Sequence, residues 1–276
     1  MPGARANRSD GAEAAGARFA VASGHVPNPA GPWRIADERP TLGPGDLHVW
    51  RHDLDGEHDE PAAAAILSES ELSRAARLVF ERDRRRFRAG RLALRGILSR
   101  YVGHPAASLA LATRADGKPY LVDFDIEFNV SHSHRVWICA VASRIPVGVD
   151  VEELRVVPNC LSLARHHFSR VEADALAAVP AEHRDRAFLA CWTRKEAYLK
   201  VLGLGLSADL GAFVAGFGPD DVTLAGSAPE SSRDVHLRTF SPGPGAIGAL
   251  GFMEKPNRIE YFVAPAAGAA HEKGAR

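Results

Sequence analysis

The chain has 276 residues, of which 46% are hydrophobic and 25% charged, proportions typical of a globular protein and not of a disordered, fibrous or membrane-spanning chain. Its 34 Lys and Arg residues balance its 34 Asp and Glu residues, so the net charge is zero and no overall field favours nucleic acid or a membrane. The three cysteines, Cys139, Cys160 and Cys191, form no C-x-x-C pair, which argues against a disulfide framework or a thiolate zinc site and favours the cytoplasm.

The two ends of the chain differ in composition from its body. Residues 1–44 are rich in Ala, Gly, Arg and Pro and lack a helical or strand period, and residues 265–276 resemble them, so we expect both to be disordered. We expect a folded N-terminal half over 45–143 and a C-terminal half over 144–264. No run of about 20 apolar residues and no secretory signal is present, so neither a membrane span nor export is expected.

The N-terminal half begins with a strand pattern over residues 47–50 and continues with helical spacing over 61–80. Residues 68–71 supply capping groups for a helix that runs toward Phe80. Residues 84–101 form a long helix whose apolar positions alternate with seven arginines. Those arginines are either a solvated face paired with acidic neighbours or a surface for an anionic ligand.

The rest of the body alternates between strand and helix patterns. A turn is expected at 115–120 and a junction of the two halves at 144–146. The predicted strands are 128–131, 136–143, 147–152, 235–240, 246–252 and 258–263, and the predicted helices are 161–168, 171–178 and 186–202, the last ending at Gly203. Helices and antiparallel strands in both halves indicate an α+β fold.

Two acidic residues stand on one face of the strand predicted over 147–152. Side chains two positions apart project from the same face of a strand, so Asp150 and Glu152 point together. Two carboxylates aimed at one spot repel each other unless a cation or a shared proton lies between them. The pair is therefore either a solvated acidic face or part of a cation site.

Glu196 falls in line with the apolar residues of the helix predicted over 186–202. A buried carboxylate is costly unless it is paired. Lys200, one turn later, is one candidate partner. The other is a Mg²⁺ ion bound jointly by Asp150, Glu152 and Glu196, with Lys200 facing a substrate phosphate.

The sequence Ser131-His132-Ser133-His134 follows a predicted strand. A hydroxyl and an imidazole N–H both donate hydrogen bonds, so Ser131 and His132 are candidates for phosphate contacts. His-x-His also suggests zinc, but no further His or Cys stands at a familiar ligand spacing. The residues alone predict Mg²⁺-dependent chemistry on a phosphoanhydride or a phosphodiester.

Four motifs in this order and spacing resemble those of the Sfp-type phosphopantetheinyl transferases, over about residues 45 to 240. They are Gly-Lys-Pro at 117–119, Phe-Asn-Val-Ser-His-Ser at 128–133, Val-Gly-Val-Asp-Val-Glu at 147–152, and Trp-Thr-x-Lys-Glu-Ala-x-x-Lys at 192–200. The resemblance implies a monomer of two similar α+β halves related by pseudo-twofold symmetry, with coenzyme A bound in the cleft between them. It implies transfer of the 4'-phosphopantetheine arm of coenzyme A to a serine of an apo acyl or peptidyl carrier protein, with release of adenosine 3',5'-bisphosphate.

The resemblance also implies roles for individual residues. Asp150, Glu152 and Glu196 match the Mg²⁺ ligands, and Glu172 matches the carboxylate that takes the serine proton. The residues that match coenzyme A contacts are Arg74, Arg86, Lys118, Ser131, His132, Lys195 and Lys200, of which Lys200 is also expected to act in catalysis. Glu71 and Phe87 depart from the pattern, since other members carry a basic residue and a small hydroxyl residue there.

A surface for the carrier protein is expected over residues 154–168, which include the apolar Leu161 and Phe168. Two other functions remain open from the residues alone. A nucleic-acid-binding module on the arginine-rich helix would show steep salt dependence without a need for Mg²⁺. A Mg²⁺-dependent nuclease or phosphodiesterase would hydrolyse its substrate instead of transferring a group.

Overall fold

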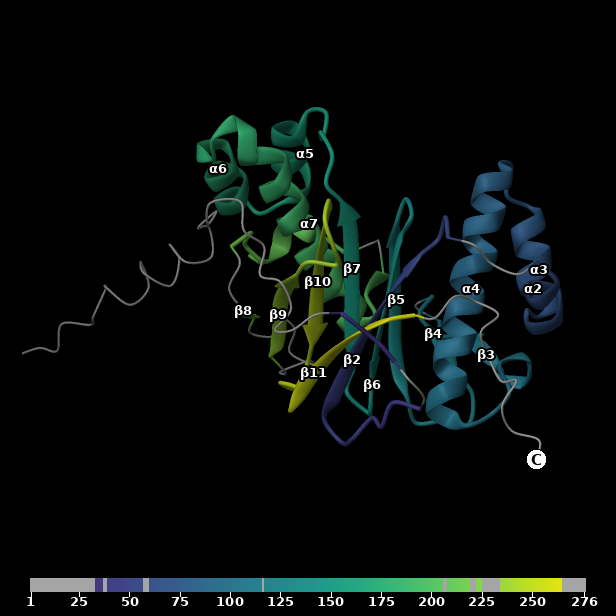
Figure 1. Ribbon diagram of the computed structural model, residues 1–276. Helices are drawn as coiled ribbons and strands as arrows, with labels where there is room; N and C mark the ends of the chain where they lie inside the picture. The colour runs from purple at the N-terminus through teal and green to yellow at the C-terminus, as the bar shows by residue number, and fades with distance from the viewer. Residues whose placement is uncertain are drawn as a thin grey trace, which may run out of the picture.

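The computed structural model describes residues 33–36, 39–56, 60–115, 117–205, 208–218, 222–224 and 234–264. Within these residues the chain is a mixed α+β protein in which two sheets lie at the centre and helices lie on either side (Figure 1). The predicted fold class is thereby confirmed.

One group of helices covers a five-stranded sheet of order β1-β11-β2-β6-β5. Its strands are β1 (Arg34–Ile35), β2 (Asp46–Asp53), β5 (Glu127–Ser133), β6 (Val136–Ala142) and β11 (Arg258–Val263). The helices beside it are α2 (Glu60–Ile66), α3 (Glu69–Ala76) and α4 (Glu81–Val102), and β3 (Leu111–Thr113) pairs with β4 (Pro119–Leu121) in a separate hairpin. The apolar face of α4, including Ile97 and Leu98, packs against Trp50 and Phe128 of this sheet.

A second group covers a four-stranded sheet of order β7-β10-β9-β8. The strands are β7 (Val147–Glu153), β8 (Val222–Leu224), β9 (Val235–Phe240) and β10 (Ala246–Phe252), and the helices are α5 (Cys160–His167), α6 (Arg170–Ala178) and α7 (Ala181–Leu202). Ala197 and Val201 of α7 pack with Ala249 of β10.

The two sheets repeat one order of connection. In each sheet a first strand is followed by helices that end in a long one, and the last two strands after them complete the order β2-β6-β5 or β7-β10-β9; the β3–β4 hairpin precedes these two strands in the first case and β8 in the second. The long helices α4 and α7 have 22 residues each, and each ends at a left-handed glycine, Gly103 (φ 70°) and Gly203 (φ 68°). Glycine adopts this conformation without a steric penalty, so it ends helices readily.

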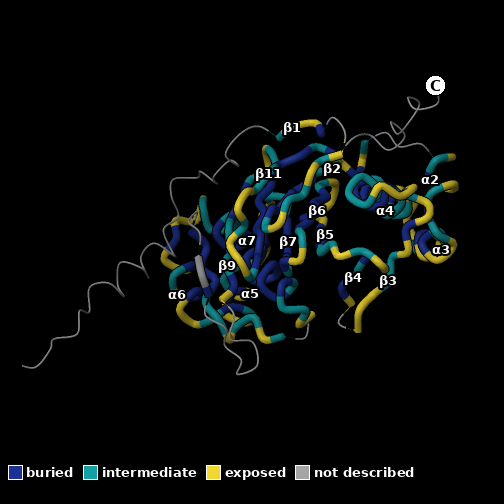
Figure 2. The backbone as a smooth tube through the Cα atoms, turned by 90° about the horizontal axis from the view of Figure 1, so that it is seen from below, coloured by how far each residue is buried: buried dark blue, intermediate teal, exposed yellow. Residues whose placement is uncertain are grey.

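The inner faces of the two sheets pack against each other and form a central apolar core, visible as a buried band in Figure 2. Val147, Val149 and Val151 of β7 enter this core, as the alternation of the strand predicts. The residues between them face the opposite side, toward α7. This alternation therefore places Asp150 beneath the long helix.

Three boundaries differ from the sequence predictions. The helical spacing over 61–80 is divided between α2 and α3; α3 starts at a capping box of Ser68 and Glu71, as predicted, but ends at Ala76 and does not reach Phe80. The strand Arg258–Val263, expected in the C-terminal half, pairs in parallel with β2 of the other sheet. The disorder expected over 1–44 is wrong for its last part, since β1 pairs with β11; residues 1–32 and 265–276 lie outside the described residues.

Candidate active site

Asp150 lies in the middle of β7 with only 6% of its surface exposed. Its Oδ1 accepts a hydrogen bond from Ser131 Oγ at 2.7 Å and one from Lys200 Nζ at 2.6 Å. Burial raises the pKa of this carboxyl, and the nearby Glu152 carboxylate raises it further, although the Lys200 ammonium opposes them. Asp150 is therefore a buried acid whose pKa stays raised even though Lys200 is its ion-pair partner.

Glu196 of α7 is the second buried acid, with 8% of its surface exposed. Burial raises the pKa of its carboxyl, and the Asp150 and Glu152 carboxylates add to the increase, although the Lys200 ammonium opposes them. Within the described part of the chain, this carboxylate accepts no hydrogen bond and joins no ion pair. Glu196 is thus buried, and Asp150 and Glu152 lie close enough for their charges to raise its pKa.

The close approach of α7 to β7 depends on Gly148. A Cβ atom at this position would lie 2.2 Å from the carbonyl oxygen of Ala197 and 2.8 Å from the amide nitrogen of Val201. No side chain fits there, so the helix backbone rests directly on the strand two residues before Asp150. Glycine at this position thus allows one acid from the strand and one from the helix to share a site.

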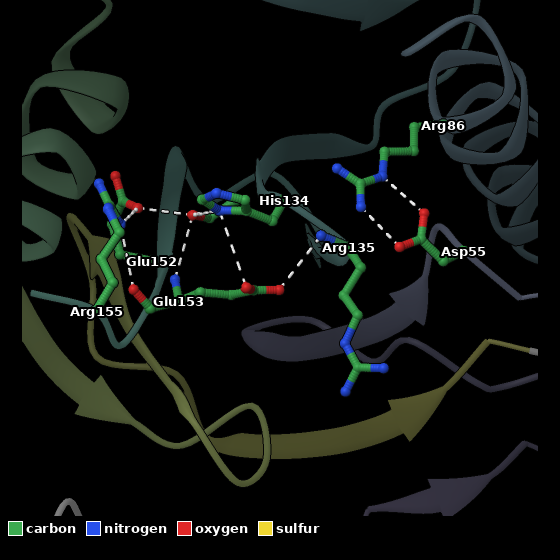
Figure 3. A network of polar contacts seen from close by, with 8 residues as sticks. Asp55, Arg86, His134, Arg135, Glu152, Glu153 and Arg155 are labelled. Atoms are coloured by element: carbon green, nitrogen blue, oxygen red, sulfur yellow. Dashed lines mark hydrogen bonds and ion pairs between the residues drawn. The ribbon is translucent and has the colours of Figure 1, made fainter. Parts of the chain in front are cut away.

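Glu152 lies at the end of β7, and Figure 3 shows its carboxylate beside the turn between β5 and β6. Its Oε2 accepts hydrogen bonds from Ser133 Oγ and from Arg155, both at 2.7 Å. The adjacent Glu153 approaches His134 of that turn, with Oε2 3.9 Å from Nδ1. Two of the predicted metal ligands therefore lie in the middle and near the end of β7, and the third lies on α7.

Basic groups border this acidic cluster. His132 of β5 has a lowered pKa, chiefly because of desolvation and then because of the positive charges of Lys200 and Arg86. Arg86 of α4 forms a two-pronged ion pair with Asp55, with nitrogen-to-oxygen distances of 2.7 and 2.6 Å (Figure 3). Lys200 and Arg86 thus lie close enough to His132 for their charges to lower its pKa, and Arg86 is held by a carboxylate of its own half.

Glu172 and Lys195 form an ion pair of 2.7 Å in which both side chains are 0% exposed. Both carboxylate oxygens of Glu172 accept further hydrogen bonds, from Ser169 on one side and from the amides of Ala215 and Gly216 on the other. Although burial raises the pKa of this carboxyl, Lys195 and these donors outweigh it and hold the pKa below its usual value. The pair has the surroundings of a structural contact between α6 and α7.

Three other predicted contacts lie as follows. Lys118 is buried, donates to the carbonyl oxygen of Val147 at 3.0 Å, and lies 3.6 Å from Glu127. Arg74 is exposed on α3, with its guanidinium over the ring of Phe87 at 5.5 Å. Ser131 bonds Asp150, as described above. Glu71, the departure from the family pattern, is buried and pairs with two arginines of α4.

The donor set fits a hard divalent cation, because carboxylates are its preferred protein ligands. Among the described residues, no three His, Cys, Asp or Glu side chains already converge at metal-site spacing. Asp150 and Glu152 instead point to protein donors, namely Lys200, Ser131, Ser133 and Arg155. Sequence reasoning missed Ser133 as a partner of these acids, although its position two residues after Ser131 was a visible signal.

Comparison with known proteins gives a consistent result. Residues 146–237 match the family model described as the 4'-phosphopantetheinyl transferase superfamily, and residues 56–144 match the one described as 4'-phosphopantetheinyl transferase, N-terminal. No helix in the described parts of the chain has the length and apolar character needed to cross a bilayer.

Individual relatives agree with the family models. The chain is 40% identical over 226 residues to 4'-phosphopantetheinyl transferase HetI of Nostoc sp., an alignment that covers 80% of this chain and 94% of that protein. It is 31% identical over 189 residues to a 4'-phosphopantetheinyl transferase of Bacillus pumilus, covering 68% and 78%. It is 29% identical over 182 residues to 4'-phosphopantetheinyl transferase Sfp of Bacillus subtilis, covering 66% and 80%.

Proposed function

Because the chain belongs to the 4'-phosphopantetheinyl transferase superfamily, we propose that coenzyme A, Mg²⁺ and a carrier-protein serine meet at the acidic cluster of Asp150, Glu152 and Glu196. The enzyme transfers phosphopantetheine to carrier proteins. In the proposed reaction the serine oxygen bonds to the β-phosphorus of coenzyme A, while the bond from that phosphorus to the bridging oxygen breaks. Adenosine 3',5'-bisphosphate leaves with the bridging oxygen, and the serine loses its proton.

The observation that carries the metal assignment is the Glu196 carboxylate. It is buried, it has no donor among the described residues, and it lies beside two more carboxylates that raise its pKa. A divalent cation would remove this repulsion and, when bound, neutralise charge on the substrate phosphates. Lys200 contacts Asp150 and keeps about a quarter of its side chain exposed, so its ammonium also faces the region where a phosphate would bind.

We propose that Lys200, His132 and Arg86 contact the phosphates of coenzyme A, and that the exposed Arg74 contributes to the 3'-phosphate contact. The cationic groups align and neutralise the pyrophosphate, which is the main protein contribution to phosphoryl transfer. The influence of Lys200 and Arg86 on the pKa of His132 supports their grouping. Arg86 would have to exchange Asp55 for a phosphate.

The sequence predicts that three further residues act on the substrate, namely Lys118, Lys195 and Glu172. Their surroundings instead support a positioning role. Lys118 bonds the backbone of β7, and the pair of Lys195 and Glu172 has no exposed side-chain surface. A proton acceptor must approach the serine hydroxyl to within hydrogen-bonding reach, directly or through one water. Glu172 as the acceptor of the serine proton stays a prediction, and a variant described in the Discussion tests it.

We infer that the two halves are related by pseudo-twofold symmetry and that coenzyme A binds in a cleft between them. The repeated strand order and the matched helices α4 and α7 support the symmetry. The acids come from β7 and α7, whereas His132 and Arg86 come from β5 and α4. A ligand that contacts all of them would touch both halves.

We also infer that the enzyme acts as a monomer in the cytoplasm, without nucleic acid or a membrane as partner. The three cysteines, Cys139, Cys160 and Cys191, are all free thiols, which fits a reducing compartment.

A carrier-protein surface is proposed at the segment after β7 and at α5, with one correction to the residues. Phe168 is buried and stacks on Phe188, so it belongs to the core and not to the surface. The exposed apolar side chains there are Val156 and Leu163, and Val171 is exposed on the following helix, α6. Arg165 lies among them, and an acidic, partly apolar partner would complement this surface.

Mass spectrometry of an apo carrier protein after incubation with the enzyme, coenzyme A and Mg²⁺ tests the function. A mass gain of one phosphopantetheine is expected. Hydrolysis of coenzyme A without a mass gain would indicate a phosphodiesterase. Binding of nucleic acid with steep salt dependence and no transfer would indicate a binding module.

Substitutions of the acids test the site. Asp150→Ala and Glu196→Ala should abolish transfer while the fold is kept, because each removes one charge from a like-charged cluster. Asp125→Ala is the matched control, since this exposed aspartate pairs with Arg144 on the surface. Full transfer activity in either site variant would refute the metal assignment.

A further inference from the structure

Three buried polar side chains alternate along β5. The three side chains, Asn129, Ser131 and Ser133, are 5%, 8% and 8% exposed. The residues between them on the strand are less buried. Successive side chains of a strand point to opposite faces, so these three share one face. That face is turned toward β7, because each of the three side chains bonds β7.

The contacts form a regular series. Asn129 Oδ1 accepts from the amide of Val149 at 2.9 Å, and Ser131 Oγ donates to Asp150. Ser133 Oγ donates to Glu152 Oε2 and accepts from the amide of Glu153 at 3.2 Å. The partner numbers rise together, so β5 and β7 run in the same direction, side by side as in Figure 1.

These two strands are the edge strands at which the sheets meet, since β5 ends the order of one sheet and β7 begins the order of the other. Within the described residues, backbone pairing joins each of them only to its own sheet. A buried edge strand has backbone N–H and C=O groups that no neighbouring strand pairs. Leaving these groups without hydrogen-bond partners costs free energy of folding. On β7 side chains supply those partners: Asn129 for the amide of Val149, Lys200 for its carbonyl and Lys118 for the carbonyl of Val147.

We propose that Asn129, Ser131 and Ser133 form a side-chain ladder that replaces backbone pairing between β5 and β7 and orients the Asp150 and Glu152 carboxylates for a divalent cation. Asn129 joins the strands, and the two serines each fix one carboxylate oxygen. Ser131 is then a positioning residue that acts through Asp150. The orienting part rests on the proposed metal-dependent function, whereas the joining part does not.

The orienting part is tested with two substitutions of one residue. Ser131→Ala removes the donor to Asp150, and Ser131→Thr keeps it. Loss of an outer hydrogen bond to a metal ligand costs about 10–100-fold in metal affinity. We expect this weakening of Mg²⁺ binding in Ser131→Ala, measured by calorimetry with coenzyme A present, and a matching rise in the KM for Mg²⁺ with kcat less affected.

Ser108→Ala is the control, since the Ser108 hydroxyl donates only to the carbonyl of Pro105 in an exposed turn, at 2.8 Å. Ser131→Thr and Ser108→Ala should bind Mg²⁺ as the unsubstituted enzyme does. Wild-type Mg²⁺ affinity in Ser131→Ala, or an equal loss in Ser131→Thr, would overturn the orienting role. If the unsubstituted enzyme binds no Mg²⁺ with coenzyme A, the proposed metal site fails and the orienting role fails with it.

The joining part is tested without metal. Asn129→Ala leaves the amide of Val149 without its acceptor, so hydrogen exchange in β7 should become faster, with no such change in Ser108→Ala. Unchanged protection of the Val149 amide would overturn the joining role. This measurement reads the contact between the sheets and does not depend on transfer activity.

Discussion

The most direct test of how the site is built is Gly148→Ala. The added Cβ would lie 2.2 Å from the carbonyl oxygen of Ala197, whereas ordinary contact begins at 3.4 Å. The two atoms nearest to the added methyl group, the Ala197 oxygen and the Val201 nitrogen, belong to helix backbone and cannot rotate away; the Lys200 Cβ follows at 3.0 Å. The helix α7 must therefore move away from β7 by about 1 Å if the contact is to be relieved.

This movement has a cost in stability and a larger cost in rate. Overpacking of a close-packed contact costs about 1–3 kcal/mol. The same shift separates Glu196 from Asp150, and a displacement of about 1 Å at a catalytic site costs roughly a hundredfold in rate. The expected result is a folded enzyme with a lower melting temperature and about a hundredfold slower transfer, measured by the mass assay.

Gly96→Ala is the matched control on the other long helix, because a Cβ there meets no atom within 4 Å. Alanine is favoured over glycine in a helix interior by about 1 kcal/mol, so this variant should be slightly more stable and equally active. If Gly148→Ala keeps both the melting temperature and the transfer rate of the unsubstituted enzyme, the helix does not rest on the strand as described.

Three further predictions concern stability. Burial lowers the pKa of His48 to about 4 despite the opposing Glu260 carboxylate. Between pH 7 and pH 5 the unfolded chain therefore binds a proton that the folded chain does not, and the free energy of unfolding falls by about 2 kcal/mol. The variant His48→Gln should show a flatter dependence of this free energy on pH, measured by denaturant unfolding. Lys195→Met should cost about 3–5 kcal/mol, because it leaves the Glu172 carboxylate buried and unpaired, and an equally stable but inactive variant would favour a direct catalytic role for the pair. Gly103→Ala should raise the free energy of the folded state by about 1 kcal/mol, seen as a lower melting temperature, because φ is 70° there.

The sequence predicts the regular elements well where the hydrophobic period is long. The helix patterns over 84–101 and 186–202 correspond to α4 and α7, and strict alternation predicts β7. The sequence does not predict β1, because a strand of two residues has no period. It also does not predict the place of β11, because a parallel partner far along the chain leaves no local signal. Which sheet a strand joins depends on tertiary packing.

For the site, spacing predicts that Asp150, Glu152 and Glu196 share a region, since the periods of strand and helix fix their faces. It does not predict which basic groups are already paired. Lys195 is next to Glu196 in the sequence, but its side chain points into the core and pairs there with Glu172. Neighbouring positions on a helix are about 100° apart, so one faces the acids and the other the core.

Because both halves share one order of strands and helices, features found in both can be assigned to folding, and features found in one half to function. In the first half a capping-box acid, Glu71, pairs with Arg95 of the long helix, and in the second half Glu172 of a capping box pairs with Lys195. Counted from the starts of α4 and α7, Arg95 and Lys195 occupy the same position. Both buried ion pairs therefore join a short capped helix to a long one, which is a requirement of the fold that both halves share.

The residue at the next position differs between the two long helices, and this difference changes what each half can bind. It is Gly96 in α4 and Glu196 in α7. Beneath the second helix, Gly148 admits the backbone closely and Asp150 supplies a second carboxylate, whereas β2 presents the buried Trp50 to the core beneath the first helix. One half packs an apolar core where the other places buried acids, so the repeated frame carries the proposed metal ligands in its second half only.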